Sequence, residues 1–237
     1  MAGGRLLLNM AFPPRCPSCR APVLAAHQFC AGCFSQLRLI STPMCDCCGI
    51  PFPVALADGG QCPECLAEPP AFARARAVMV YDGVTAPLIT SLKFNDQWAG
   101  LNRYAEMMAA AGSALLKEAE IIVPVPLNWR RFWQRKYNQA ALLAYALAQQ
   151  NSVACAPSLL RRQRATTPQM RLTRDERKKN VKGAFVVAAP AKVKGKHVLL
   201  VDDVVTTGAT VEACAVALLK AGAKQVDVIA LARTVRD

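Results

Sequence analysis

Short apolar runs and longer helix-forming stretches alternate along the chain after residue 77. Unbroken apolar runs predict strands that are buried on both faces, and these runs are residues 78–81, 121–126, 184–187, 198–201 and 226–232. Stretches rich in Ala, Leu and Met predict helices between them, at residues 87–94, 101–117, 140–149 and 211–221. Gly222 follows the last of these as a helix stop. The alternation predicts an α/β domain with a mostly parallel sheet and flanking helices.

Residues 1–70 follow a different pattern, in which four C-x-x-C pairs replace apolar periodicity. Tetrahedral zinc takes two such pairs, so the segment predicts a small double zinc ribbon with two structural zinc ions. Sequential pairing is the simplest arrangement, and it gives one site from Cys16, Cys19, Cys30 and Cys33 and another from Cys45, Cys48, Cys62 and Cys65. Disulfides are the alternative reading. Cys47 is a ninth thiol that could replace a ligand or oxidise.

A Glu-Pro-Pro run at residues 68–70 is the expected linker between the two parts. It divides the chain into a zinc-ribbon domain at residues 1–70 and an α/β domain at residues 71–237. The remaining cysteines, Cys155 and Cys214, lie in apolar surroundings and are expected to be inert core thiols. His197 precedes a strand and is expected to be structural.

The clearest chemistry follows the apolar run at residues 198–201. Two adjacent carboxylates end that strand, and a small, hydroxyl-rich loop leads on into a helix; the residues are Asp202, Asp203, Thr206, Thr207, Gly208, Ala209 and Thr210. Small residues let backbone N–H groups approach an anion, and a helix N-terminus favours negative charge. Carboxylates suit a sugar diol or a Mg²⁺ ion carried by the ligand. Together these features predict a site for a phosphorylated ribose.

Two other readings of this loop remain. A Walker B strand also ends in acidic residues, but the chain has no G-x-x-x-x-G-K-[ST] sequence to accompany one. The second reading is a buried strand and a capped helix without any ligand. Two consecutive carboxylates at a strand end are costly unless something binds them, which favours the ligand.

The net charge is +13, and the excess lies after residue 70. Residues 128–182 hold thirteen Lys or Arg against two acidic residues, which predicts a polyanionic partner. Cations alternate with aromatic residues near the start of this segment, at Arg130, Arg131, Arg135 and Lys136. They could stack on single-stranded nucleic acid, bind pyrophosphate or form a solvated basic turn. Residues 158–183 are cation-rich and weakly periodic, which favours a mobile lid over an anionic substrate.

Targeting signals are not evident. No stretch approaches the roughly 20 apolar residues of a membrane helix, and residues 1–12 lack the apolar core of a signal peptide. We therefore expect a cytoplasmic protein.

In combination these motifs resemble the ComF/GntX family of phosphoribosyltransferase-like proteins linked to bacterial competence. The shared features are the four C-x-x-C pairs, residues 92–94, 123–127, 168–169 and 183–185, Arg135 with Asn138 and Gln139, Arg177 with residues 180–181, and the loop at 202–210. One position departs from the family: Lys136 stands where the family usually has glycine in an Arg-Gly-aromatic-Asn-Gln motif.

The resemblance implies a type I phosphoribosyltransferase fold behind a double zinc ribbon, and Mg²⁺-dependent binding of phosphoribosyl pyrophosphate (PRPP). It implies that Asp202 and Asp203 hold the ribose hydroxyls and that residues 206–210 surround the 5′-phosphate. The anion-binding set for pyrophosphate would be Arg130, Arg131, Arg135, Lys136, Asn138 and Gln139. No residue stands out as a general base.

For biological role, the resemblance implies DNA uptake and utilisation in natural competence. Single-stranded DNA and replication-restart or recombination proteins are the implied partners. Two hypotheses of different class therefore follow. One is a pentosyl-transferring enzyme that uses PRPP, and the other is a non-catalytic adaptor for single-stranded DNA or proteins that retains the fold as a scaffold.

Overall fold

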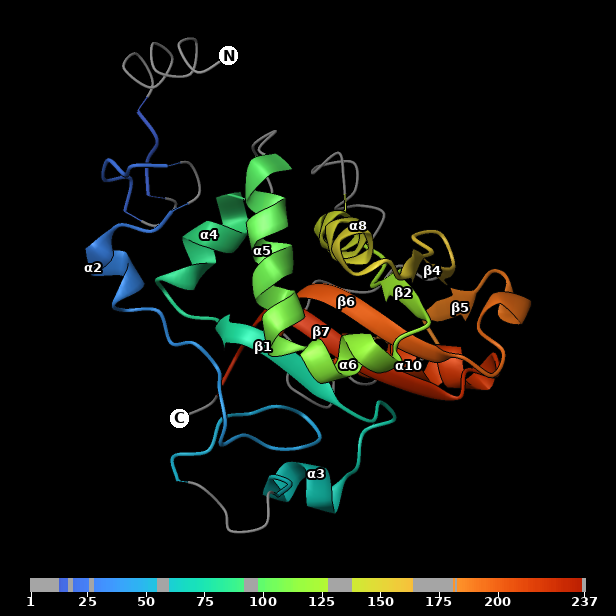
Figure 1. Cartoon of the computed structure of the whole chain (residues 1–237). Coiled ribbons are helices and arrows are strands. Elements are labelled where there is room, and N and C mark those ends of the chain that lie inside the picture. Colours follow the sequence, from blue (N-terminus) through green and yellow to red (C-terminus); the bar gives the residue numbers. More distant parts are fainter. Residues whose placement is uncertain are drawn as a thin grey trace.

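The computed structural model describes residues 13–16, 19–25, 28–54, 60–91, 98–127, 138–163, 181 and 183–235. Its centre is a five-stranded sheet in which every paired strand runs parallel to its neighbour. The strand order is β1-β7-β6-β2-β3 (Figure 1). The strands are β1 Ala75–Val80, β2 Ile121–Pro124, β3 Ala154–Cys155, β6 His197–Val205 and β7 Gln225–Arg233. The predicted α/β class with a parallel sheet is confirmed.

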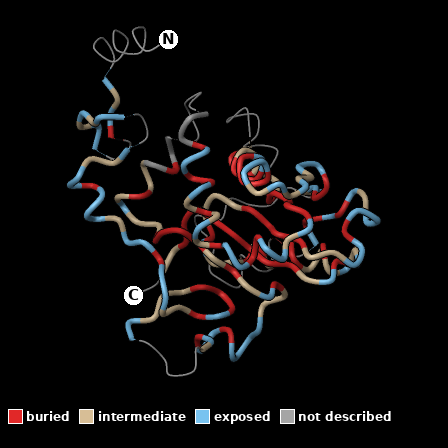
Figure 2. The backbone as a smooth tube through the Cα atoms, in the orientation of Figure 1, coloured by how far each residue is buried: buried red, intermediate tan, exposed pale blue. Residues whose placement is uncertain are grey.

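Helices cover both faces of this sheet (Figure 1). They are α4 Thr85–Ser91, α5 Trp98–Ala111, α6 Ser113–Glu118, α8 Gln139–Asn151 and α10 Ala209–Lys220, with a 3₁₀ turn at Pro190–Lys192. Alternate residues of β6 serve the two faces, as expected for a strand. Leu199 packs with Met108 of α5 and Leu143 of α8, whereas Leu200 packs with Leu218 of α10. Buried positions therefore follow the strands and the helix sides that face them (Figure 2).

A glycine divides the helix expected at residues 101–117 into α5 and α6. A Cβ atom at Gly112 would collide with Cδ1 of Ile229 in β7. Glycine therefore lets the end of α5 approach the sheet without any shift of the Ile229 side chain. Met108 of α5 is buried in the core, and Met107 packs at the edge of the same cluster.

A small antiparallel pair of strands stands apart from the main sheet. It joins β4 Leu160–Arg162 to β5 Phe185–Val187. The β5 strand was expected, whereas β4 was not, and it falls inside the segment predicted to be a mobile lid; the lid stays a prediction. The strand was missed because three residues with two arginines have no apolar period of their own and are stabilised by the partner strand. Residues 164–180 and 182 lie outside the described residues.

The cysteine-rich part contains only short helices in its described residues, α2 Ala31–Phe34 and α3 Pro63–Ala67. It meets the sheet at the free edge of β1, where Ile40 N donates to Val78 O at 2.9 Å and Val80 N donates to Arg38 O at 2.8 Å. The expected domain boundary at residue 70 stays a prediction. Among the helices described, none combines the length and the hydropathy needed to cross a membrane.

Candidate functional site

The predicted phosphate loop lies at the carboxyl end of β6, a central strand of the sheet. Gly208 has φ of +79° and forms the N-cap of α10, a left-handed conformation that glycine adopts without strain. Its carbonyl accepts the Glu212 amide at 2.9 Å. The first amides of α10 therefore point out of this end of the sheet, where ligands bind in open α/β folds.

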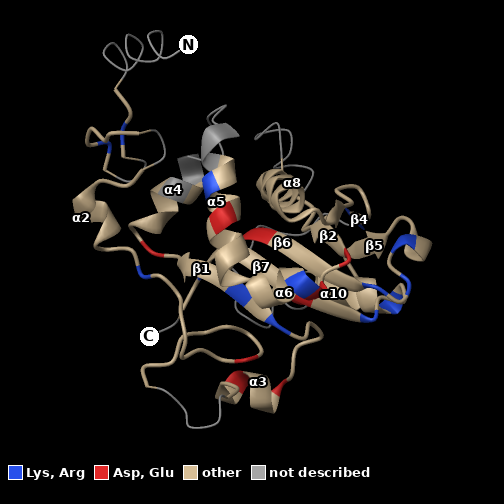
Figure 3. Cartoon of the chain, in the orientation of Figure 1, with Lys and Arg blue, Asp and Glu red and all other residues tan. Residues whose placement is uncertain are grey.

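The acidic pair lies within β6, not after it as the sequence predicted. The strand continues through Asp202 and Asp203 to Val205 because it keeps pairing with β7 over this length. The Asp202 carboxylate accepts the Asp203 amide at 2.9 Å, and the Asp203 carboxylate accepts the Val204 amide at 2.8 Å. Both side chains are thereby fixed at the end of the strand, where acidic residues colour the ribbon (Figure 3).

The electrostatics of the pair favour a cationic or diol ligand. Burial raises the pKa of Asp202 well above its usual range, and the neighbouring Asp203 carboxylate raises it further. Within the described part of the chain, no Lys or Arg forms an ion pair with either carboxylate. A divalent cation brought by a ligand, or the hydroxyls of a sugar, would relieve this repulsion. The donor set therefore fits Mg²⁺.

The loop threonines differ in their surroundings. The Thr206 carbonyl accepts a hydrogen bond from Thr234 Oγ1 at 3.0 Å, so the loop is tied to the residue that follows β7. The hydroxyl of Thr207 is buried and has no hydrogen-bond partner among the described residues. An unpaired buried hydroxyl costs free energy, and a phosphate oxygen would satisfy it. Thr210 lies in the first turn of α10.

A second helix, α8, begins at the same carboxyl end of the sheet. The Asn138 side chain accepts the Ala140 amide at 3.1 Å as the N-cap of α8, and its Nδ2 donates to Val125 O at 3.0 Å. Gln139 is 2% exposed, and its Nε2 has no partner among the described residues. Because β2 pairs with β6, α8 and α10 begin beyond the carboxyl ends of neighbouring strands, on opposite faces of the sheet. The four cations predicted with this pair, Arg130, Arg131, Arg135 and Lys136, lie outside the described residues.

Sequence reasoning missed the contact that Arg162 makes in the small β4–β5 sheet. Its guanidinium lies over the Phe185 ring, 5.3 Å from the centroid. Burial raises the pKa of the Cys214 thiol in α10, the Asp202 carboxylate raises it further, and Arg162 offsets part of that rise. Cys214 is fully buried, as expected of a core thiol. No local signal identifies Arg162, because only a long-range strand pair places it.

The cysteines form the two predicted clusters. In each of them, Cys16/Cys19/Cys30/Cys33 and Cys45/Cys48/Cys62/Cys65, the Sγ atoms lie within 4.8 Å of one another. The Sγ atoms of Cys19 and Cys30 are 3.5 Å apart, and those of Cys48 and Cys62 are 3.6 Å apart. Zinc–sulfur bonds of about 2.3 Å in a tetrahedron place sulfurs roughly 3.8 Å apart, so both clusters fit zinc.

The second cluster also has the amide contacts of a metal knuckle. Cys45 Sγ accepts the backbone amides of Cys48 at 3.4 Å and of Cys62 at 3.2 Å. Such bonds stabilise a thiolate and orient it. The spare Cys47 is buried beside this cluster but is not one of its four members. Burial raises the pKa of the Cys47 thiol.

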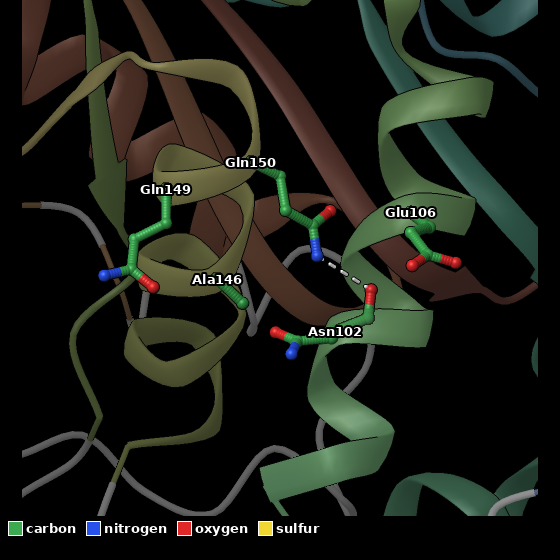
Figure 4. A pocket seen from close by; sticks show the side chains of 5 residues that line it. All are labelled: Asn102, Glu106, Ala146, Gln149 and Gln150. Atoms are coloured by element: carbon green, nitrogen blue, oxygen red, sulfur yellow. Dashed lines mark hydrogen bonds between the residues drawn. The ribbon is translucent and has the colours of Figure 1, made fainter.

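A polar groove of about 480 Å³ lies elsewhere, between α5 and α8 (Figure 4). Its lining consists of Asn102, Glu106, Ala146, Gln149 and Gln150. The Gln150 amide donates to the Asn102 carbonyl at 3.0 Å, so part of its polar surface is already satisfied within the chain. None of the predicted ligand-binding residues lines this groove.

Comparison with known protein families gives two matches along the chain. Residues 7–66 match a double zinc ribbon domain, and residues 139–236 match a phosphoribosyl transferase domain. The second match covers α8, the strands β3 to β7, the loop after β6 and α10.

Similar proteins extend over nearly the whole chain. DNA utilization protein YhgH of Escherichia coli (strain K12) is 36% identical over 231 residues, which cover 95% of this chain and 99% of that protein. Competence protein F of Haemophilus influenzae is 33% identical over 226 residues, which cover 92% and 96%. Among solved structures, the PRPP amidotransferase of B. subtilis, complexed with ADP and GMP, matches 56% of this chain and 26% of its own at 21% identity, with a TM-score of 0.39. The chain therefore belongs to the ComF/GntX family, in which a double zinc ribbon precedes a phosphoribosyltransferase domain.

Proposed function

We propose that this protein binds PRPP together with Mg²⁺ at the loop between β6 and α10. The observation that carries the proposal is a combination within one loop. Gly208 opens a helix N-terminus toward the ligand side of the sheet, the Thr207 hydroxyl is buried without a described partner, and beside them stand two carboxylates that form no ion pair with a described Lys or Arg. One loop therefore offers groups that can bind a phosphate, a sugar diol and a divalent cation.

In the proposed complex each group has one task. The ribose hydroxyls donate to Asp202 and Asp203, while the amides and hydroxyls of residues 206–210 bind the 5′-phosphate. Asn138 and Gln139 open the neighbouring helix toward the pyrophosphate. The cations of residues 130–136 would approach the same group, and this is a proposal from sequence alone.

The reaction compatible with this arrangement is transfer of the phosphoribosyl group to an acceptor nucleophile, which forms a bond to the ribose C1 atom as the C1–O bond to pyrophosphate breaks and pyrophosphate leaves. Positive charge develops on the sugar ring, and negative charge develops on the leaving group. Bound Mg²⁺ supplies charge neutralisation for that leaving group. The amides at the start of α8, and the cations expected from sequence at residues 130–136, would hold the pyrophosphate in place. The two carboxylates keep the ribose oriented during departure of the leaving group.

We further propose that the site serves DNA utilisation in the cytoplasm. Support comes from the names of the relatives, which are DNA utilization and competence proteins. The basic segment at residues 128–182 gives a physical reason, since its charge suits a nucleic acid backbone. Replication-restart or recombination proteins are the proposed partners in that role.

The alternative is a non-catalytic adaptor that binds single-stranded DNA or proteins and keeps the transferase fold as a scaffold. The same basic segment favours this alternative. The adaptor hypothesis predicts binding of single-stranded DNA that weakens steeply with salt and on removal of Arg130 or Arg135. Binding that is absent or insensitive to salt would exclude direct DNA contact by this segment.

Isothermal titration with PRPP and Mg²⁺ tests the principal proposal. We expect saturable binding by the natural protein and loss of most of it in the Asp202→Asn/Asp203→Asn double variant. Ribose 5-phosphate is the comparison ligand, since it retains the phosphate and diol but lacks pyrophosphate. No heat of binding from the natural protein, under conditions in which it is folded and zinc-loaded, would remove PRPP as its ligand.

A further inference from the structure

The two cysteine clusters are attached to the rest of the molecule in different ways. All four cysteines of the second cluster belong to the buried cluster that contains α10, together with Phe72 and Ala75. Among the described residues, the first cluster's cysteines belong to neither buried cluster. Hydrogen bonds in its segment join near neighbours, such as Phe34 N to Cys30 O at 2.8 Å. The second metal centre is thus part of the core beneath the loop.

Two consecutive residues connect this second cluster to the loop. Arg233 ends β7 and is 8% exposed, and its Nη1 donates to the carbonyl of Cys48. The next residue, Thr234, donates from Oγ1 to the Thr206 carbonyl at 3.0 Å and from its amide to Val205 O at 3.0 Å. The metal knuckle and the first residue of the loop are therefore held by neighbouring residues of one short segment.

A second connection reaches the other end of the loop. Glu212, in the first turn of α10, accepts the Ala71 amide with both carboxylate oxygens, at 3.1 and 2.9 Å. Ala71 follows closely on α3, the helix that carries Cys65. The amide of Glu212 also donates to Gly208 O at 2.9 Å. The segment that follows the second cluster therefore holds the first turn of α10, the helix whose N-terminus faces the proposed phosphate.

We propose that the Cys45/Cys48/Cys62/Cys65 cluster is a positioning element for residues 206–210, acting through Arg233 and Thr234 on one side and Glu212 on the other. Zinc orders the knuckle, the knuckle holds Arg233, and the segment of Arg233 and Thr234 holds the loop in its anion-binding conformation. The consequence for ligand affinity rests on the proposed PRPP function. The mechanical connection is a property of the ligand-free chain.

Hydrogen exchange of the ligand-free protein measures the connection directly. In Arg233→Met and in Thr234→Val we expect amides of residues 206–210 to exchange about tenfold faster, the size expected for loss of one hydrogen bond. Zinc content is expected to stay at two ions per chain in both variants. The Arg233 variant loses the bond to the knuckle, and the Thr234 variant loses only the bond to the loop. If Arg233→Met does not fold, Thr234→Val and Glu212→Gln carry the test.

Two matched controls separate positioning from general damage. Arg76 donates from Nη1 to Asp46 O of the same knuckle at 3.0 Å, but it lies on β1, so Arg76→Met is expected to leave the loop amides unchanged. Thr234→Ser keeps the hydroxyl and is expected to exchange like the natural protein. Faster exchange spread evenly over α8 and β7 as well would indicate general destabilisation and overturn the proposal.

Titration with PRPP and Mg²⁺ adds the ligand readout. We expect about tenfold weaker binding in Arg233→Met and Thr234→Val, and unchanged binding in both controls. Unchanged loop exchange in both test variants would overturn the positioning role, whatever the titration gives. Faster loop exchange with no PRPP binding by the natural protein would overturn the proposed ligand and leave the mechanical connection standing.

Discussion

Arg74 Nη2 lies 2.6 Å from Asp227 Oδ2 and, on its other side, 2.8 Å from Glu118 Oε2. The Asp227 side chain is 6% exposed, so this one guanidinium neutralises a carboxylate that water reaches poorly. The arrangement joins the entry to β1, the end of α6 and the start of β7 at the edge of the sheet away from the loop. The pair therefore stabilises the fold and is remote from the proposed chemistry.

Replacing Arg74 is predicted to destabilise the protein strongly. In Arg74→Met, the Asp227 carboxylate loses its charged partner while it stays buried, and a cost of about 3 kcal/mol in the free energy of unfolding is expected. Denaturant titration measures it. The control is Arg103→Met, which removes an exposed pair with Glu106 and is expected to cost less than about 0.5 kcal/mol. Equal effects of the two variants would contradict the assigned role of Asp227.

The acidic pair is predicted to cost stability at neutral pH. Burial and Asp203 raise the pKa of Asp202 in the folded state, so folding opposes ionisation of this group. Stability is therefore lost as the pH rises from the unfolded pKa, about 4, through the raised folded pKa. Asp202→Asn is expected to unfold at a higher temperature than the natural protein at pH 7, and this gain should vanish below about pH 4. Calorimetry of both proteins across that pH range measures the difference in unfolding temperature. If Asp202→Asn is less stable than the natural protein at pH 7, the pKa of Asp202 is not raised in the folded state.

Thr207 is predicted to show opposite effects on stability and on binding. Thr207→Val keeps the side-chain shape and removes a buried hydroxyl that lacks a described partner, so the ligand-free protein is expected to gain about 1 kcal/mol of stability. Loss of a hydrogen bond to a phosphate should weaken PRPP binding about tenfold or more. Thermal unfolding and titration of the same sample provide both values. If the variant is less stable and binds normally, the hydroxyl has a structural partner and no ligand role.

Gly49 is predicted to be intolerant of any side chain. Its φ is +69°, and a Cβ atom would collide with the carbonyl oxygen of Ala75 in β1. Gly49→Ala is expected to cost more than about 1 kcal/mol, with weaker retention of the zinc held by Cys48. Gly32→Ala is the matched control in the other ribbon segment, because a Cβ there meets no atom within 4 Å. Urea unfolding and zinc analysis are the measurements. Similar stabilities of the two variants would contradict the close contact between knuckle and sheet.

Local pattern predicted most of the regular structure. The apolar runs of β2, β5, β6 and β7 and the helix α10 were evident because each has its own hydrophobic signal. Strand ends were less well predicted: pairing with β7 carries β6 through Asp202 and Asp203, and no local signal outweighs two carboxylates. The break at Gly112 depends on Ile229, more than 100 residues away in sequence.

For the site, composition and spacing identified the loop, the acidic pair and both cysteine clusters, since each is a continuous or regularly spaced motif. Arg162, Arg233 and Thr234 were missed because their roles depend on partners from distant segments. Arg233 contacts Cys48, which lies 185 positions earlier. The acceptor is a backbone carbonyl, which every residue has, so the sequence does not show that Cys48 is the partner. Arrangements of this kind become evident only when the fold is known.

Strand order also has a consequence for how the chain is made. β7 lies between β1 and β6, although it is synthesised after every other strand of the sheet. Until it emerges, β1 lacks its parallel neighbour, and the described segment that pairs with its other edge is residues 38–40. The cysteine clusters are available to bind zinc long before then. Metal loading is therefore expected to precede closure of the sheet, and the early ribbon would shield one edge of β1 from pairing with other nascent chains.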